Sequence, residues 1–319
     1  MKIVVLDGYA LNPGDLSWGD FESLGDVCVY ERTSVTDKQE IVQRIGDAEV
    51  ILTNKTPIDE TILAQVPQLK YIGVIATGYN VVDIEAAKKR GIPVTNIPAY
   101  GTDAVAQFTF ALLLEIVNQV GLHNESVQQG DWQKSIDFTY QKTPLIELKA
   151  KTIGLIGYGA IAQTVAKIAH AFDMQVIFWN HRPKEAPDWA EQVSLDKLYQ
   201  RADIISLHVP QTKETQQMIN QTAITKMKDG VILINTARGG LLEESTVAAA
   251  LNKGKIYAAG VDVVSKEPMN SENPLITAKN CFITPHIAWG AKETRARLMG
   301  IALDNVVQFL DGQPKNVVN

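Results

Sequence analysis

Cysteine is scarce in this sequence, which contains only Cys28 and Cys281 among its 319 residues. Two cysteines so far apart provide neither a disulfide framework nor a cluster of metal ligands. A small disulfide-rich protein is therefore excluded, and we expect no bound metal. Such sparing use of cysteine fits a reducing compartment, so we expect a cytoplasmic protein.

Long hydrophobic runs are also missing. The apolar run at residues 3–6 stops at Asp7, which makes it shorter than the apolar region of a signal peptide. The most apolar later stretch, residues 104–117, is interrupted by Gln107 and Glu115 and is too short to span a bilayer. We therefore expect neither a secretory leader nor an association with membranes.

Nor is there an excess of positive charge. The 30 lysine and arginine residues face 36 aspartate and glutamate residues, for a formal net charge of −6. A general nucleic-acid binder would show a basic excess, so we expect no nucleic-acid partner. With 45% hydrophobic and 21% charged residues, the composition is that of an ordinary globular protein. The length indicates about two domains, with a cleft between them.

The first hundred residues alternate short apolar runs with helix-like stretches. Residues 3–6, 50–52 and 71–75 have the length and β-branched composition of strands. Residues 38–45 and 59–66 have the pattern of surface helices. This alternation predicts a parallel sheet with helices on both faces.

Residues 104–118 form the longest helical pattern of this part of the chain, and they are apolar nearly all round. A helix of that kind is buried, either between domains or against a second subunit. We interpret it as the bridge out of the first domain.

A second alternating set begins at residue 151. Here a strand at residues 153–156 precedes a helix at 161–172, and a last helix at 292–310 is expected to return to the first domain. Further strands are expected at residues 176–179, 204–208, 231–234, 258–263 and 282–284. Six parallel strands with intervening helices make a doubly wound fold. The sequence thus predicts an α/β protein of two Rossmann-like, doubly wound parallel-sheet domains, covering residues 1–100 plus 290–319 and residues 101–289.

The strongest local motif is the GYGAIA segment at residues 157–162, which lies between a predicted strand and a predicted helix. Gly157 permits a tight turn, and Gly159 lets the backbone approach a pyrophosphate. The N–H groups at the start of the helix, at Ala160 and Ile161, would then face the phosphates. The motif predicts a dinucleotide site; the alternative is a glycine-rich turn in a flavodoxin-like domain.

The end of the next expected strand, at residues 176–179, bears on the choice between NAD and NADP. NAD sites usually place an acidic residue at its end, where it binds the adenosine ribose. Here the strand runs into Asn180-His181-Arg182, and the first acid is Glu185. Asn180 removes the repulsion that a carboxylate would exert on a 2′-phosphate, and Arg182 with His181 could attract that phosphate. Alternatively, Arg182 is solvated and Asn180 binds the ribose of NAD. We expect NAD(H) or NADP(H), with the preference open and dual use included.

Arg238, Glu267 and His286 share one placement, because each lies just past the carboxyl end of a predicted strand. Ligands of open α/β sheets bind at that edge. These three residues beside a dinucleotide suggest hydride transfer on a carboxylate substrate. Taken singly, each residue could equally be solvated or structural.

Charge suggests a division of labour within this trio. The planar guanidinium of Arg238 can hold a carboxylate and a 2-oxo group. An imidazole titrates near neutral pH, so His286 can give a proton to the carbonyl oxygen and take it back from the alcohol. Glu267 would hydrogen-bond the other imidazole nitrogen and fix the orientation of the ring.

With this trio and the glycine motif, the chain resembles the D-isomer-specific 2-hydroxyacid dehydrogenases over essentially its full length. The most specific pieces are NTARGG at residues 235–240, GVD at 260–262 leading to Glu267-Pro268, and TPH at 284–286. The resemblance implies that Arg238 binds the substrate, that His286 is the acid and base, and that Glu267 is its partner. It also implies that residues 101–289 bind the dinucleotide and that the other domain is the substrate domain.

The resemblance implies further cofactor contacts in the second domain. Asp262 would lie near the nicotinamide carboxamide, and Val209 and Pro210 would border the adenine. Residues that would line the cofactor channel are Thr236, Ala237, Arg238 and His286.

In the first domain, the turn at residues 76–80 matches the substrate loop of the family, whose domain closes over the substrate. Backbone N–H groups at Ala76, Thr77 and Gly78 would hold the substrate carboxylate, and Thr77 would reach the cofactor. Lys55 could add a cation at the mouth of the site, although alone it would be a surface lysine.

The segment Ile287-Ala288-Trp289 is similar to the glycerate dehydrogenase or hydroxypyruvate reductase branch. We therefore expect reduction of a small 2-oxo acid such as hydroxypyruvate or glyoxylate, and the reverse reaction on the D-2-hydroxy acid. The alternatives are a non-catalytic NAD(H)-sensing protein of the same fold and a relative that oxidises an anion such as phosphonate. A homodimer is expected, because residues 104–118 are too apolar for a solvated helix and members of the family pair there.

Overall fold

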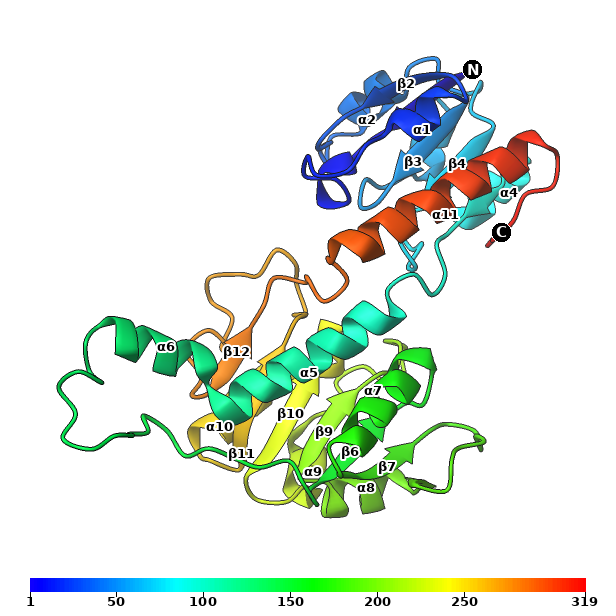
Figure 1. Cartoon of the computed structure of the whole chain (residues 1–319). Helices are drawn as coiled ribbons and strands as arrows, with labels where there is room; N and C mark the ends of the chain where they lie inside the picture. The colour runs from blue at the N-terminus through cyan, green and yellow to red at the C-terminus, as the bar shows by residue number, and fades with distance from the viewer. The chain divides into compact units, whose positions relative to one another are not determined.

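The computed structural model describes all 319 residues and separates into two units, each built on its own sheet (Figure 1). Unit 1 comprises Met1–Gly101 and Gly290–Asn319, and unit 2 comprises Thr102–Trp289. Every paired strand in both sheets is parallel. The predicted fold class, α/β with two doubly wound parallel sheets, is confirmed.

Unit 1 has a five-stranded sheet in the order β2-β1-β3-β4-β5. Its strands are β1 (Lys2–Val5), β2 (Asp26–Val29), β3 (Val50–Thr53), β4 (Tyr71–Val74) and β5 (Val94–Thr95). The sequence predicted only the three central strands. The two edge strands were missed because β5 has two residues and β2 buries none of its four residues fully, so neither leaves a long apolar run.

Three helices of unit 1 begin at side-chain caps. Asp37 accepts hydrogen bonds from the first turn of α2 (Lys38–Ile45), and Asp59 does so for α3 (Glu60–Leu63). The structure places α2 as predicted, whereas α3 is shorter than the helix predicted at residues 59–66. The short elements that remain are η1 (Gly8–Ala10), α1 (Gly19–Glu22) and α4 (Ile84–Lys89).

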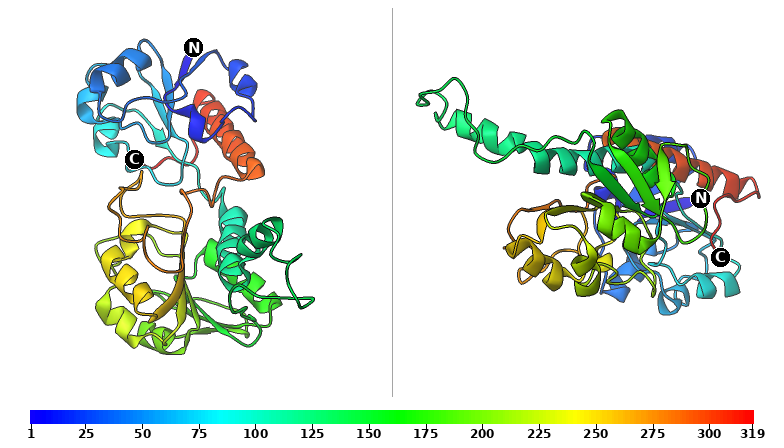
Figure 2. Two further views of the ribbon diagram at one scale, coloured as in Figure 1. Left: turned by 90° about the vertical axis from the view of Figure 1, so that its left-hand side faces the viewer. Right: turned by 90° about the horizontal axis from the view of Figure 1, so that it is seen from below.

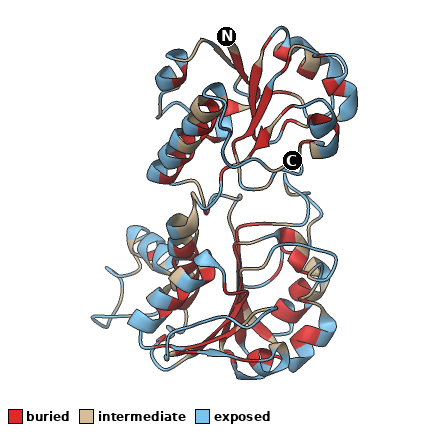
Figure 3. Ribbon diagram, turned by 90° about the vertical axis from the view of Figure 1, so that its right-hand side faces the viewer, coloured by how far each residue is buried: buried red, intermediate tan, exposed pale blue.

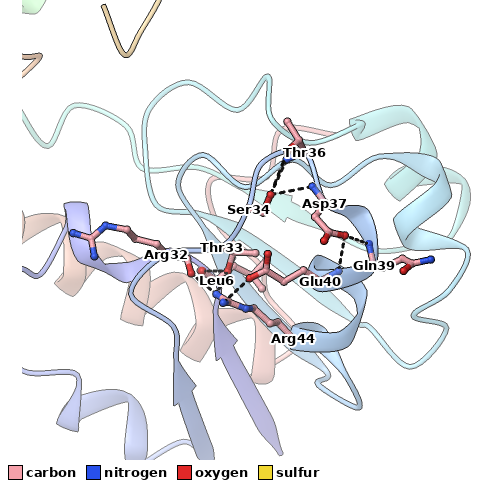
Figure 4. A network of polar contacts seen from close by, with 9 residues as sticks. All are labelled: Leu6, Arg32, Thr33, Ser34, Thr36, Asp37, Gln39, Glu40 and Arg44. Atoms are coloured by element: carbon pink, nitrogen blue, oxygen red, sulfur yellow. Dashed lines mark hydrogen bonds and ion pairs between the residues drawn. The ribbon is translucent and has the colours of Figure 1, made fainter.

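Two sets of contacts join distant segments of unit 1: a polar network around Arg44 and the packing of the last helix on the sheet. Arg44 of α2 pairs with Glu40 and donates to Thr33, which itself donates to the carbonyl of Leu6 beyond β1 (Figure 4). The last helix, α11 (Lys292–Leu310), packs on β4, where the ring of Phe309 lies 4.8 Å from that of Tyr71. The predicted return of this helix to the first domain is therefore observed.

Unit 2 has a seven-stranded sheet in the order β12-β11-β10-β9-β6-β7-β8. Its strands are β6 (Thr152–Ile156), β7 (Gln175–Trp179), β8 (Ala190–Gln192), β9 (Ile204–Leu207), β10 (Val231–Asn235), β11 (Ile256–Val261) and β12 (Cys281–Ile283). The prediction of six strands was wrong because it missed β8. This edge strand has only three residues, of which one is buried. The strand order reverses between β6 and β9, and the crevice outside such a switch point is where these sheets bind ligands.

Helices cover both faces of this sheet (Figure 3). One face carries α5 (Thr102–Asn118) and α7 (Ala160–Ala171), and the other carries α8 (Leu195–Arg201), α9 (Gln221–Lys226) and α10 (Glu244–Asn252). Helix α5 buries Phe110, Leu113, Ile116 and other residues against α7, β10 and β11. Packing on its own sheet thus accounts for the buried face of this helix, while the contact between domains or subunits that its apolar character suggested stays a prediction.

A projecting arm follows α5. It consists of α6 (Val120–Gln128) and the segment to residue 147, and it extends away from the body of unit 2 in Figures 1 and 2. No single helix has the length and apolar composition to cross a membrane; α5 and α6 meet that criterion only as a pair, bent by 55°.

Candidate active site

The glycine motif forms the turn between β6 and α7. Gly157 has a φ of +96°, and a Cβ atom there would lie 2.6 Å from the carbonyl oxygen of His208 at the end of β9. Both facts require glycine at this position. At Gly159 a Cβ atom would meet nothing within 4 Å, so the absence of a side chain leaves open space at the amino end of α7. No side chain caps this helix, and its first N–H groups, at Ala160 and Ile161, fit the pyrophosphate of a dinucleotide.

Asn180 connects this turn to the loop after β7. Its Oδ1 accepts a hydrogen bond from the N–H group of Tyr158 at 3.2 Å, and its Nδ2 donates to the carbonyl of Arg182 at 2.9 Å. Gln192 of β8 donates to the same carbonyl at 3.2 Å. The loop therefore has a set conformation, with the side chains of His181 and Arg182 exposed. Sequence reasoning missed Gln192 because it missed β8.

Residues bordering the proposed adenine position follow β9. Val209 is half-buried and Pro210 is exposed. His208, which precedes them, places its Nε2 2.9 Å from Oγ of Ser206. Desolvation by burial lowers the pKa of His208 to about 4, so the ring is neutral at physiological pH.

The turn after β10 presents Arg238. The fully buried side chain of Asn235 donates to the carbonyl of Arg238 at 2.9 Å and accepts the N–H group of Ala237 at 3.1 Å. Thr236 is buried beside it, with its hydroxyl 3.0 Å from that of Thr109 in α5. This local network leaves the guanidinium of Arg238 exposed at the carboxyl edge of the sheet.

Gly239 brings this turn against the loop that follows β11. A Cβ atom on Gly239 would lie 1.9 Å from the carbonyl carbon of Val264, so only glycine allows the two segments to touch. Glu244 of α10 accepts hydrogen bonds from the N–H group and the hydroxyl of Ser265, both at 2.7 Å. These contacts fix the loop that carries Glu267.

Glu267 and His286 meet at this edge. Oε2 of Glu267 lies 2.7 Å from Nδ1 of His286, and both side chains are about one-third exposed, at 35% and 34%. The carboxylate therefore engages one ring nitrogen, and Nε2 is the nitrogen that can exchange a proton with a ligand. Of the predicted trio, the structure pairs Glu267 with His286 directly and places Arg238 at the end of the neighbouring strand.

The predicted substrate residues of unit 1 lie at the carboxyl ends of β3 and β4. The carboxylate of Asp7 accepts the N–H groups of Asn54, Lys55 and Thr56, at 2.7, 2.6 and 2.9 Å, and so holds the loop of Lys55. Ala76 and Gly78 flank Thr77, whose hydroxyl donates to the carbonyl of Ile97 at 2.8 Å. Sequence reasoning missed Asp7, because its partners are more than 40 positions away.

The whole chain contains no group of three or more histidine, cysteine, aspartate or glutamate side chains placed to hold a metal ion. The polar side chains at the carboxyl edge of the unit 2 sheet are instead hydrogen-bonded to one another and to nearby backbone groups.

Comparisons with known proteins agree with this arrangement. Residues 110–288 match the family model described as D-isomer specific 2-hydroxyacid dehydrogenase, NAD binding domain. A hydroxypyruvate reductase of Blautia hydrogenotrophica is 52% identical over 100% of both chains, and a glycerate dehydrogenase of Methylorubrum extorquens is 39% identical over 99% of this chain and 98% of its own. The solved structure of an acyclic imino acid reductase, Bsp5, in complex with NADPH and D-Arg has a TM-score of 0.85 at 31% identity and covers 100% of both chains.

Proposed function

The chain belongs to the family of D-isomer-specific 2-hydroxyacid dehydrogenases, and from this premise we propose that it reduces hydroxypyruvate or glyoxylate to the corresponding 2-hydroxy acid. It is an oxidoreductase that uses a nicotinamide cofactor. The observation that carries the proposal is the 2.7 Å contact of Glu267 with His286, at the sheet edge that also presents Arg238 and the glycine turn.

The chain's own residues supply binding and proton transfer. The nicotinamide, when bound, supplies a hydride to the carbonyl carbon of the substrate. Arg238 holds the substrate carboxylate and polarises the 2-oxo oxygen with its donors. His286 gives the proton on Nε2 to that oxygen, while Glu267 keeps Nδ1 engaged and the ring oriented. A hydride and a proton thus add across one C=O bond, and the reverse direction returns both.

The residues proposed to hold the cofactor extend along the same edge. The pyrophosphate would bind at the glycine turn, the adenine beside Val209 and Pro210, and the nicotinamide near Thr236 and Asp262. The other proposed contacts are Gly157, Gly159, Ala160, Ile161, Ala237, Arg238 and His286 in unit 2. Lys55, Ala76, Thr77 and Gly78 of unit 1 stay predictions as substrate-binding residues, and Thr77 also stays a prediction as a cofactor contact.

The loop after β7 is proposed to accept both NADH and NADPH. Asn180 brings no negative charge to the position of the ribose, and the exposed Arg182 offers a cation to a 2′-phosphate. Support comes from the fixed loop conformation, because a preformed site loses less entropy when it binds the phosphate.

A homodimer is also proposed, together with a cytoplasmic location. The sequence assigned the interface to residues 104–118, one face of which packs on its own sheet while Phe108 and Leu114 are only half-buried, so that assignment stays a prediction. The exposed apolar side chains of the arm include Trp132 at 53%, Ile136 at 102% and Phe138 at 88%. An exposed cluster of this kind is typical of an interface, and a second copy of the chain is the proposed occupant.

The direct test of the proposed chemistry is His286→Ala. We expect turnover of hydroxypyruvate to fall about 10²- to 10⁴-fold, because the positioned acid is lost. Binding of NADH, followed by fluorescence, should stay nearly intact. Unchanged turnover would remove His286 from the mechanism, and binding of NADH without turnover by the unmodified protein would favour an NAD(H)-sensing role.

A further inference from the structure

Asp262 lies immediately after β11 and is almost completely buried, with 1% of its surface exposed. Its Oδ1 accepts hydrogen bonds from the hydroxyl of Thr284 at 2.6 Å and from the N–H group of Ile287 at 2.9 Å. Its Oδ2 accepts the N–H group of Ala288 at 2.8 Å. All three donors belong to the short turn that carries His286.

The backbone of Asp262 is engaged in the same turn. Its carbonyl accepts the N–H group of His286 at 2.8 Å, and its own N–H group donates to the carbonyl of Asn235 at the end of β10. Asp262 thus joins the His286 turn to strands β11 and β10 by five hydrogen bonds, four from the turn and one to β10.

His286 needs such support because its backbone is unusual. Its φ is +55°, a left-handed conformation that residues other than glycine adopt rarely and at a cost. A conformation of this kind persists where its surroundings over-determine it, and it is found disproportionately at functional sites. Donors on both sides of His286, from Thr284 to Ala288, converge on the one carboxylate.

We propose that Asp262 is a positioning residue for His286, which sets the place of the imidazole by holding the turn on both sides of it. This inference deepens the proposed function and rests on it for the role of His286. It differs from the expectation that Asp262 serves the nicotinamide carboxamide, because it predicts an effect on proton transfer rather than on cofactor affinity.

The test uses Asp262→Asn, which keeps the shape of the side chain. An amide has a single oxygen, so its NH2 group must face at least one of the three donors and the turn is pushed away. We expect kcat to fall about 10²-fold, as misplacement by about 1 Å does in enzymes, with the KM of the 2-oxo acid and the Kd of NADH changed less than about threefold. Hydrogen exchange at the amides of Ile287 and Ala288 should accelerate about tenfold or more.

Two further variants complete the experiment. Thr284→Val removes one donor and keeps the carboxylate, so it should lower kcat by a smaller factor, about tenfold or less. Thr152→Val is the matched control, because it removes a buried hydroxyl at the amino end of the inner strand β6, away from the His286 turn, and should leave kcat and exchange at residues 287–288 unchanged.

Two results would overturn the proposal. One is a kcat for Asp262→Asn within about twofold of the unmodified enzyme. The other is a rise in the Kd of NADH as large as the loss in kcat, which would mark Asp262 as a cofactor ligand. If the unmodified protein reduced no 2-oxo acid, the proposed function would fail, but unaltered exchange in Asp262→Asn would still refute the positioning role separately.

Discussion

Asn180 holds the glycine turn to the loop after β7, the loop that we propose to set the choice of cofactor. It accepts a hydrogen bond from the glycine turn and donates one to the carbonyl of Arg182. A carboxylate at this position could still accept the first bond, but it would repel the Arg182 carbonyl. Asn180→Asp would therefore change both the charge at the proposed ribose position and the hydrogen bonds that hold its loop.

Asn180→Asp should shift the cofactor preference towards NADH, because its negative charge opposes a 2′-phosphate. The ratio of kcat/KM for NADPH to that for NADH is expected to fall about tenfold or more, which corresponds to about 1.4 kcal/mol. Arg182→Ala should lower the same ratio without adding charge. A ratio that moved in neither variant would exclude this loop as the determinant.

His208 makes stability depend on pH. In the unfolded chain its ring protonates near pH 6.5, whereas desolvation by burial in the folded state lowers its pKa to about 4. Between these values the unfolded chain binds a proton that the folded chain does not, so the free energy of unfolding decreases as the pH falls. His208→Gln should remove about 1–2 kcal/mol of that decrease between pH 7.5 and pH 5. Urea unfolding at the two pH values measures it; an equal decrease in both proteins would contradict the assignment.

Single residues were predictable where the chemistry is local to a motif. Gly157, Arg238, Glu267 and His286 each follow a strand whose apolar run is visible in the sequence, so their common edge could be inferred. The residues that hold these four in place could not be predicted from the sequence. Contacts such as those of Glu244 with Ser265 join positions distant in sequence, and no local pattern distinguishes them from solvated side chains.

Among the elements, length and burial decided what could be predicted. The long helices α5 and α11 and the buried strands β6, β9 and β10 leave clear periodic patterns. The strands β2 and β8 are short and partly exposed, and β5, although buried, has only two residues, so these three left none. The pattern of α5 indicated burial correctly, but an apolar helix carries no information about which surface covers it.

The contact between the β10 turn and the β11 loop depends on Gly239. In Gly239→Ala the new Cβ atom must displace the backbone of Val264, which should cost about 1–3 kcal/mol of unfolding free energy. Because Glu267 lies on the displaced loop, kcat should fall as well, by about 10²-fold for a shift near 1 Å. Steady-state kinetics and urea unfolding test both effects.

Gly300→Ala is the matched control for that variant. Gly300 lies inside α11, and a Cβ atom there would meet nothing within 4 Å. The substitution should raise the free energy of unfolding by about 0.5–1 kcal/mol and leave kcat unchanged. A Gly239→Ala enzyme as active as Gly300→Ala would show that the two segments need not touch.

For the molecule as a whole, the exposed apolar side chains of the arm after α5 lead us to predict a homodimer. Charges at its exposed apolar positions, introduced by Ile136→Glu and Phe138→Glu together, should convert a dimer into a monomer. Sedimentation equilibrium measures the mass. Ile276→Glu, which changes a half-exposed residue elsewhere in unit 2, should leave the dimer intact. An arm variant with twice the mass of one chain would place the interface elsewhere.

The central claim is that the chain reduces a small 2-oxo acid at the edge where Glu267 and His286 meet. The most direct measurement follows the absorbance of NADH and of NADPH at 340 nm with purified protein and hydroxypyruvate, glyoxylate or pyruvate. The account predicts oxidation of the cofactor that requires a 2-oxo acid, is fastest with hydroxypyruvate or glyoxylate, and is lost in His286→Ala. Cofactor binding without oxidation in any of these mixtures would contradict it.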